Sequence, residues 1–164
     1  MRKSIITAVG TAAAAAVIGG TGMAIASTHS ATTQTEHFQL VSTSTTSRNS
    51  NVIAYGAFTA GGTDTAGNST DTVTFPGGTF KLVHKDVSHT QHFNPATCQF
   101  TFGAKATYTI GSGTGKYAGI SGSGTAQVSV LGIGARNSKG ACSMSLPPVA
   151  QQQIIRASGP VSLP

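Results

Sequence analysis

Residues 97–110 alternate between apolar and polar side chains, and this pattern restricts the fold of the chain more than any other. The even positions hold Cys98, Phe100, Phe102, Ala104, Ala106, Tyr108 and Ile110, with Thr, Gln, Gly and Lys between them. A period of two is that of a β-strand with one buried and one wet face. A strand of this length, about 45 Å, is expected to bend, and Gly103 is the natural place for the bend.

A second long strand is predicted over residues 125–136, but its apolar side chains change phase along the way. They occupy even positions first and odd positions later: Ala126, Val128 and Val130, then Leu131, Ile133 and Ala135. This change predicts a β-bulge near Val130 to Gly132. Shorter strands are predicted over residues 37–43, 51–60, 71–75, 79–85, 140–146 and 150–158, between clusters of turn-forming residues.

The composition supports an all-β fold, because Thr, Ser and Gly dominate and strong helix formers are scarce. Seven or eight strands joined by turns form either an antiparallel sandwich or a barrel. The long bent strands and the expected bulge favour a closed barrel, in which no strand edge is left free. We therefore predict a single antiparallel β-barrel of about eight strands, preceded by a signal peptide.

The first residues have the pattern of an export signal. Arg2 and Lys3 precede an uncharged apolar run, and Ala24-Ile25-Ala26 offers a small-x-small cleavage site. A membrane anchor is the rival interpretation, but no basic stop-transfer cluster follows the run. The predicted organisation is a signal peptide over residues 1–26, a flexible mature N-terminus over 27–35 and a β-barrel domain over 36–164. The mature protein is then secreted and has no membrane segment.

The charge pattern argues against a nucleic-acid partner. The chain carries a formal charge of +6, but its basic residues are scattered and form no stripe with interleaved aromatic residues. A mildly cationic, soluble surface is the simpler interpretation, with acidic cell-wall polymers as weak partners. The sequence predicts no cofactor and contains no reliable signal for an oligomeric state.

The two cysteines, Cys98 and Cys142, both lie in the part of the chain expected to be exported. An oxidising compartment allows them to pair, so we expect a disulfide. The alternative, a reactive thiol, needs a neighbour that lowers the thiol pKa, and the sequence shows none.

A resemblance to a known family is carried by the glycine-rich stretch of residues 111–124, GSGTGKYAGISGSG, between the two long strands. Three further segments share it: Phe93 to Cys98, Ala135-Arg136-Asn137 and Gln152 to Leu163. The chain resembles the allene oxide cyclase/dirigent-like β-barrel superfamily, and most of all the small secreted bacterial proteins with such a barrel. The resemblance implies an eight-stranded antiparallel barrel with an apolar lumen. No motif matches the catalytic residues of the plant members, so the catalytic residues are unknown.

The glycine-rich stretch also invites three other interpretations, which its residues exclude. A phosphate-binding P-loop needs Ser or Thr after Gly115-Lys116, where Tyr117 stands. A dinucleotide fingerprint needs a βαβ unit and a later acidic residue. A hydrolase elbow needs Gly at position 123, which is Ser. Closely spaced glycines instead permit positive φ angles and close backbone approach in a tight connection.

Residues 84–92 contain the cluster most like a metal site, formed by His84, Asp86, His89 and His92. Imidazoles and carboxylates bind zinc or copper, but this spacing matches no known signature. On the predicted strand, His84 shares a face with Phe80 and Leu82, whereas His89 and His92 fall in a polar loop. The sequence thus favours a solvated loop with one packed histidine and no metal, with these four residues as weak candidates.

Tyr55, His84 and Tyr108 are the polar side chains that we expect to point into a lumen and bind a ligand. The structural alternative is that the tyrosines fill the barrel. Two functions follow. The first is non-catalytic binding of a small apolar molecule or a cell-envelope component, since no acid/base pair or catalytic triad is visible. The second is a cyclase- or isomerase-like enzyme, whose lumen constrains a reactive substrate.

Overall fold

In the computed structural model, which describes residues 33–143 and 145–164, eight antiparallel strands form a closed barrel. The strands are β1 (Thr33–Ser42), β2 (Asn49–Tyr55), β3 (Ala60–Thr65), β4 (Thr70–Phe75), β5 (Gly78–Asn94), β6 (Gln99–Gly111), β7 (Ser121–Ile133) and β8 (Ala150–Ser162). They follow one another in chain order around the ring, and β8 closes it by pairing with β1. The predicted all-β barrel is confirmed.

The expected signal peptide of residues 1–26 lies outside the described residues. The barrel begins earlier than predicted, at Thr33 rather than at residue 36. Residues 33–35, expected to be flexible, pair with the end of β8, and the Thr33 and Ser162 hydroxyls lie 2.8 Å apart. This pairing joins the start of the described chain to its C-terminal strand.

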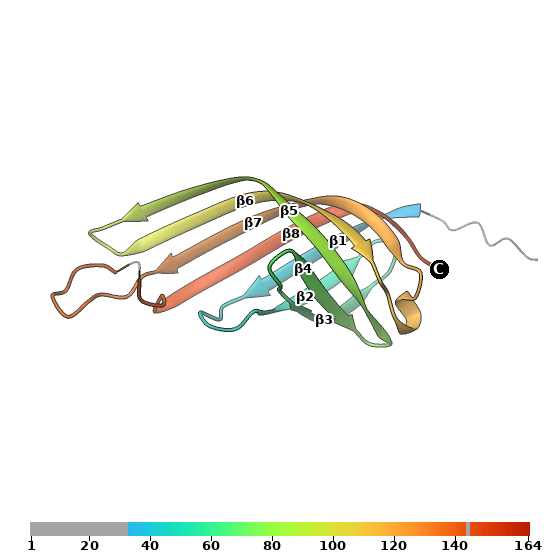
Figure 1. Ribbon diagram of the computed structural model, residues 1–164, viewed down its shortest axis with the longest axis horizontal. Helices are drawn as coiled ribbons and strands as arrows, with labels where there is room; N and C mark the ends of the chain where they lie inside the picture. Colours follow the sequence, from blue (N-terminus) through green and yellow to red (C-terminus); the bar gives the residue numbers. More distant parts are fainter. Residues whose placement is uncertain (1–32, 144) are drawn as a thin grey trace, which may run out of the picture.

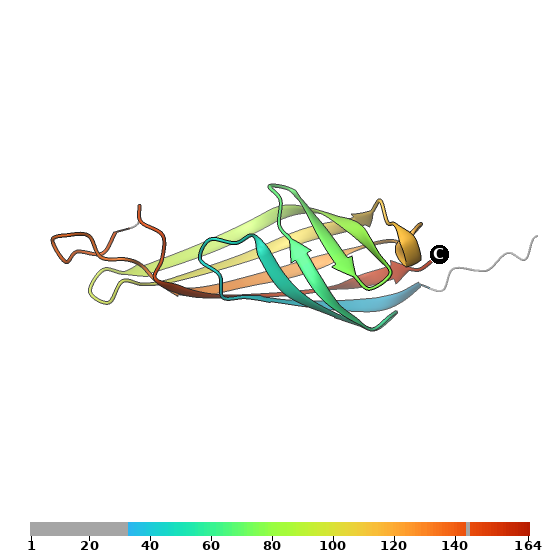
Figure 2. The same cartoon turned by 90° about the horizontal axis from the view of Figure 1, so that it is seen from below.

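The barrel is lopsided because its strands differ in length. β2, β3 and β4 have 6 or 7 residues, whereas β5 to β8 have 13 or 17. The long strands therefore continue past the short ones as a curved sheet, which Figures 1 and 2 show on the side away from the C-terminus. One end of the barrel is ringed by all the strands, and the other opens onto the inner face of this sheet.

β6 confirms the alternation predicted for residues 97–110. Ala104, Ala106, Tyr108 and Ile110 are buried, and the odd positions 101, 105, 107 and 109 are exposed. The pairing of β6 with both neighbours runs through Gly103 without a shift, and the long strands curve along their length (Figure 1). The strand thus keeps one face inside from end to end.

The predicted bulge in the second long strand is wrong. β7 pairs with β6 in one register from Gly122 to Ile133, so its even positions stay inside and Leu131 and Ile133 are exposed apolar residues of the outer face. The irregularity lies in β5 instead, between Asp86 and Ser88. Because Val87 is the extra residue there, the inner face of β5 passes from even positions to odd ones.

Two loop and strand predictions are also corrected. Residues 86–94 continue β5, because they find a full partner strand in β6. Among the described residues of 140–146 no strand forms, and Cys142 makes only an isolated bridge with Arg136. Asn137 holds this segment as a turn, since its side-chain oxygen accepts the backbone N–H groups of Lys139 and Ala141.

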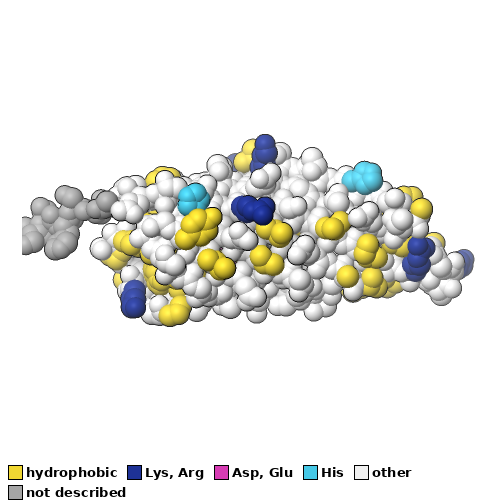
Figure 3. Space-filling model, turned by 180° about the vertical axis from the view of Figure 1, so that it is seen from behind, with side chains coloured by type: hydrophobic (Ala, Val, Ile, Leu, Met, Phe, Trp, Pro, Cys, Tyr) yellow, Lys and Arg dark blue, Asp and Glu magenta, His cyan; other side chains and the backbone are white. Residues whose placement is uncertain are grey.

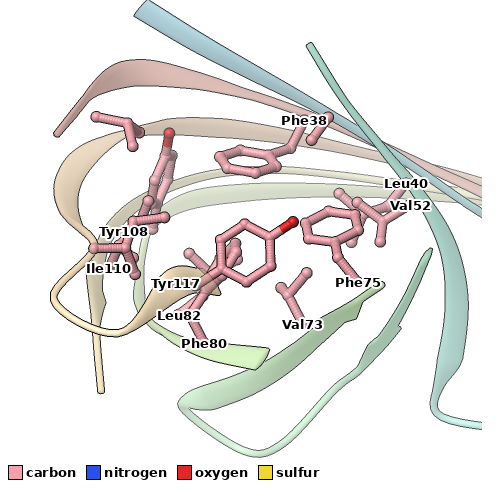
Figure 4. Close-up of a cluster of buried hydrophobic side chains, with 13 residues drawn as sticks. Phe38, Leu40, Val52, Val73, Phe75, Phe80, Leu82, Tyr108, Ile110 and Tyr117 are labelled. Atoms are coloured by element: carbon pink, nitrogen blue, oxygen red, sulfur yellow. The ribbon is translucent and has the colours of Figure 1, made fainter. Parts of the chain in front are cut away.

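An aromatic cluster fills the fully ringed end of the barrel (Figure 4). Its rings, with centroids 5.4 to 6.3 Å apart, belong to Phe38, Phe58, Phe75, Phe80, Tyr108 and Tyr117. Tyr117 enters from the short 3-10 helix η1 (Gly115–Tyr117), which lies in the glycine-rich connection. Gly115 has φ +57, and a Cβ there would lie 2.0 Å from the Gly77 carbonyl oxygen. Only glycine fits this position, as the sequence led us to expect.

The expected disulfide is present and joins the two connections at the far end of the long strands. Cys98 bonds to Cys142, 44 positions later in the sequence, and their Cα atoms are 5.3 Å apart. Arg136 supports the same junction, because its guanidinium donates to the carbonyl oxygens of Ala96 and Gly140. The bond thus ties the β5–β6 turn to the long connection between β7 and β8.

Replacing both Cys98 and Cys142 by Ala should lower the free energy of unfolding by about 3 to 4 kcal/mol, because the unfolded chain loses a cross-linked loop. Denaturant unfolding followed by circular dichroism measures the change. The wild-type protein under reducing conditions is the control and should show the same loss. A loss below about 1 kcal/mol would contradict a stabilising role for this bond.

Candidate functional site

The barrel separates the charges of the chain into an acidic inside and a basic outside. The protein has four acidic residues, Glu36, Asp64, Asp71 and Asp86. Each lies at an inner-face position of its strand. In the register of the sheet, Glu36 pairs with Gly159, Asp64 with Val73, Asp71 with Leu82 and Asp86 with Ala106. Every described Lys and Arg is exposed. Figure 3 shows one side of the molecule with basic side chains and histidines and without any acidic group.

Asp71 and His84 form the central polar contact of the lumen. His84 Nε2 lies 3.2 Å from Asp71 Oδ1, and the same oxygen accepts the backbone N–H of Gly67 at 2.9 Å. β4 and β5 bring the two residues together, because Asp71 pairs with Leu82, one inner position before His84. A carboxylate that holds one ring nitrogen fixes the orientation of the imidazole. The expectation that His84 faces inward beside Leu82 agrees with this arrangement.

Asp64 is the most deeply buried group near this pair. Its residue is 2% exposed, and Oδ1 has no hydrogen-bond partner among the described residues. Burial raises the pKa of the Asp64 carboxyl to about 7, and the negative charge of Asp71 raises it further in the same direction. Near neutral pH this buried carboxyl is therefore partly protonated.

A cavity of about 200 Å³ lies inside the barrel next to the aromatic cluster, and Phe38 and Tyr108 belong to both. Its polar side is formed by Asp71, His84 and Asp86 from β4 and β5. The rest of the lining is mostly apolar and includes Leu40, Leu82, Val128, Ile155 and three alanines, Ala106, Ala126 and Ala157. The cavity thus combines an apolar body with one acidic, hydrogen-bonding side.

Tyr108 lines this cavity, as predicted, but its hydroxyl makes no hydrogen bond among the described residues. Burial, and then the charge of Glu36, raise the pKa of Tyr108 to about 12. The ring fits because Gly124 lies opposite, where a Cβ would be 2.7 Å from the Tyr108 hydroxyl oxygen. Tyr108 is therefore both part of the core and a neutral, unpartnered hydroxyl at neutral pH.

The expectation that Tyr55 points into the lumen is wrong. Val52 and Ala54 supply the inner face of β2, so Tyr55 lies on the outer face, where it is 49% exposed. Its ring stacks on His37 of β1, with ring centroids 5.0 Å apart. Apolar residues occur on both faces of this strand, because Ile53 is exposed between the buried Val52 and Ala54.

The four weak metal candidates do not converge. His84 and Asp86 face the lumen, His89 stacks on Phe102 farther along the sheet, and His92 pairs with Thr101 on the outer face. In the described part of the chain, no three His, Cys, Asp or Glu side chains lie close enough to hold a metal ion. The bulge at Val87 turns His92 to the outer face, whereas His89 stays on the inner face but lies farther along β5 than His84 and Asp86.

Two acidic residues that sequence reasoning missed occupy opposite ends of the core. Glu36 is completely buried and accepts the backbone N–H of Phe58 at 2.9 Å, which fixes the β2–β3 turn over the aromatic cluster. Burial raises the pKa of the Glu36 carboxyl. Asp64 lies in the glycine-rich segment between the predicted strands over residues 51–60 and 71–75, which was expected to form a turn. The signal that could have found them is the scarcity of acidic residues. A cationic chain with only four of them gives a reason to consider each one as a candidate site residue.

Comparisons with known proteins add no relative, because no family model, no curated protein and no solved structure matches the chain. Across residues 33–143 and 145–164, the structure contains no helix long and apolar enough to cross a membrane.

The pH dependence of stability should reveal Asp64. The folded protein holds this proton up to about pH 7, whereas the unfolded chain releases it near 3.8, so the contribution of Asp64 to stability falls as pH rises between these values. Asp64→Asn should remove that decline and raise the free energy of unfolding at pH 8 by on the order of 3 kcal/mol. Urea unfolding from pH 4 to pH 8 measures it.

Asp86→Asn is the matched control, because it makes the same change at an exposed inner-face position. If wild type and Asp64→Asn showed parallel pH profiles, Asp64 would be ionised in the folded protein.

Proposed function

We propose that this is a secreted, non-catalytic carrier that binds a small apolar molecule in its barrel lumen, with a neutral or positively charged polar end of the ligand against Asp71, His84 and Asp86. The observation that carries the proposal is the cavity of about 200 Å³ with apolar walls and one acidic side. A binding site of this kind needs a shape for the apolar body and a few polar groups for orientation.

The size of the cavity limits the ligand. Pockets that bind drug-sized ligands have volumes of roughly 300 to 1,000 Å³, so this smaller cavity takes a smaller molecule or the end of a longer one. The inner face continues from the cavity over the long strands along one row of the register, from Gln153, which lines the cavity, to Val130 and Phe102. A longer apolar chain would leave the lumen along this row.

The separation of charge limits the ligand further. All four acidic side chains are on the inner face and the described cations are outside, so among the described residues the lumen presents carboxyl groups and no Lys or Arg. A carboxylate would meet Asp71 and Asp86 without any Lys or Arg from the described inner face. A neutral or cationic end group avoids this repulsion, and an amine gains a charge-assisted hydrogen bond.

Secretion is part of the proposal and is supported by the disulfide, which fits an oxidising environment, and by the export signal expected over residues 1–26. Membership of the allene oxide cyclase/dirigent-like superfamily is proposed as well. Its support is the glycine-rich connection and the eight-stranded antiparallel barrel, the architecture that this resemblance implies.

A cyclase- or isomerase-like enzyme is the second candidate, favoured by the contact between His84 and Asp71. An imidazole held by a carboxylate at the wall of a cavity is a common arrangement for a general base. The two functions differ in the fate of the bound molecule. Mass spectrometry of ligand recovered after incubation separates them, because a carrier returns it unchanged and an enzyme returns an isomer that His84→Ala no longer forms.

Binding of octylamine and octanoate, followed by isothermal titration calorimetry at pH 7, tests the carrier proposal. Octylamine should bind at least tenfold more tightly, which corresponds to about 1.4 kcal/mol. Ala126→Leu should abolish binding by filling the cavity, and Asp86→Asn should reduce the preference for the amine.

Thr101→Leu is the matched control, because it places the same leucine side chain on the exposed outer face of β6 and should leave binding unchanged. Equal affinity for octanoate, or full binding by Ala126→Leu, would contradict the proposed site.

A further inference from the structure

The outer face of the barrel carries a groove that the lumen proposal does not use. It has a volume of about 730 Å³ and crosses β1, β8, β7 and β6, with Tyr55 of β2 and Val87 of β5 at its ends. Most of the residues that line it occupy outer-face positions of these strands, and the inner-face residues Phe38, Ala106, Ala126 and Ala157 line it as well. The sheet itself therefore separates this groove from the cavity inside the barrel.

The groove follows from the sizes of the side chains in one row of the sheet. Tyr55 and His37 stand at one end of the row, and Ser158, Thr125 and Thr107 follow on the next strands in register. Small hydroxyl side chains beside two large rings leave a depression in the surface. Its floor offers hydroxyl groups, which donate and accept hydrogen bonds.

The neighbouring row supplies two cations. Arg156 pairs with Gln127, and Gln127 pairs with Lys105, so the backbones of the two cationic residues are two strand spacings, about 10 Å, apart. Among the described residues neither forms a salt bridge, and all four acidic residues lie on the inner face. The groove therefore holds two exposed positive charges that no acidic side chain of the described chain neutralises.

Tyr55 adds an aromatic surface at the edge of the groove. The ring is 49% exposed and is held by the stack with His37, at 16° between the ring planes. The face of an aromatic ring attracts the weakly positive C–H groups of a sugar ring.

We propose that this groove binds an acidic polysaccharide, a chain of sugars bearing carboxylate or phosphate groups. Lys105 and Arg156 would bind the anionic groups, Tyr55 would stack on a sugar ring, and Gln127 with the hydroxyls of the floor would bind sugar hydroxyls. A nucleic acid fits less well, because binding it depends on many clustered cations and this groove offers two.

Affinity for polygalacturonate, measured by microscale thermophoresis on the full secreted protein, tests this site. Lys105→Gln with Arg156→Gln should weaken binding at least tenfold, and Tyr55→Ala at least threefold. Lys81→Gln with Lys139→Gln is the matched control, because it removes the same charge from exposed positions outside the groove and should change binding less than twofold. Neutral dextran of the same length should not bind measurably.

Equal losses in the two double variants would overturn the proposal in favour of diffuse attraction to a cationic protein. Competition by oligothymidylate at the same concentration as polygalacturonate would overturn it in favour of a nucleic acid. Octylamine binding in the lumen should be unchanged in every groove variant, so failure of the groove and failure of the lumen site give different results.

Discussion

Closure of the ring by β1 and β8 is the constraint on which the rest of this structure depends. The pairing runs from Thr33 with Ser162 to Ser42 with Gln153. As a result, each of the eight strands has a partner strand on both sides. Once the sheet is closed, each side chain lies either in the lumen or outside, and neighbours along a strand must alternate. The separation of charge is therefore a property of the register. A shift of one residue in any strand would bring its inner side chains to the surface.

The accuracy of the sequence predictions depended on how clearly each strand distinguishes its two faces. In β6 the even positions are apolar and the odd ones polar, so the inner face was predicted correctly along the whole strand. In β7, Leu131 and Ile133 are apolar residues on the outer face. They make the apolar pattern of the sequence change phase, although the register of the strand does not change. The real change, at Val87 in β5, is invisible in a polar segment, because the flanking residues show no preference for either face.

The candidate site divides in the same way. His84 was placed correctly because it continues the apolar series of Phe80 and Leu82, whereas Tyr55 was misplaced because Val52 and Ile53 make both faces of β2 apolar. Asp64 was beyond prediction from local pattern. It becomes part of the site only when β3 and β4 pair and bring it beside Val73, two residues from Asp71. Its raised pKa is thus a tertiary effect of burial and of a neighbour that a different strand supplies.

The wall between the lumen and the outer groove is a single layer of sheet. Ala106, Ala126 and Ala157 lie side by side on β6, β7 and β8, and they contribute to both hollows. Their methyl groups are short enough to leave space inside, while the backbone that carries them forms part of the groove floor outside. That backbone is hydrogen-bonded to a neighbouring strand on both sides, so it cannot move toward one hollow without breaking the ladder. Two ligands on opposite faces of this wall would therefore contact the backbone of the same residues. They would still bind independently, because the paired sheet has a single conformation at this position.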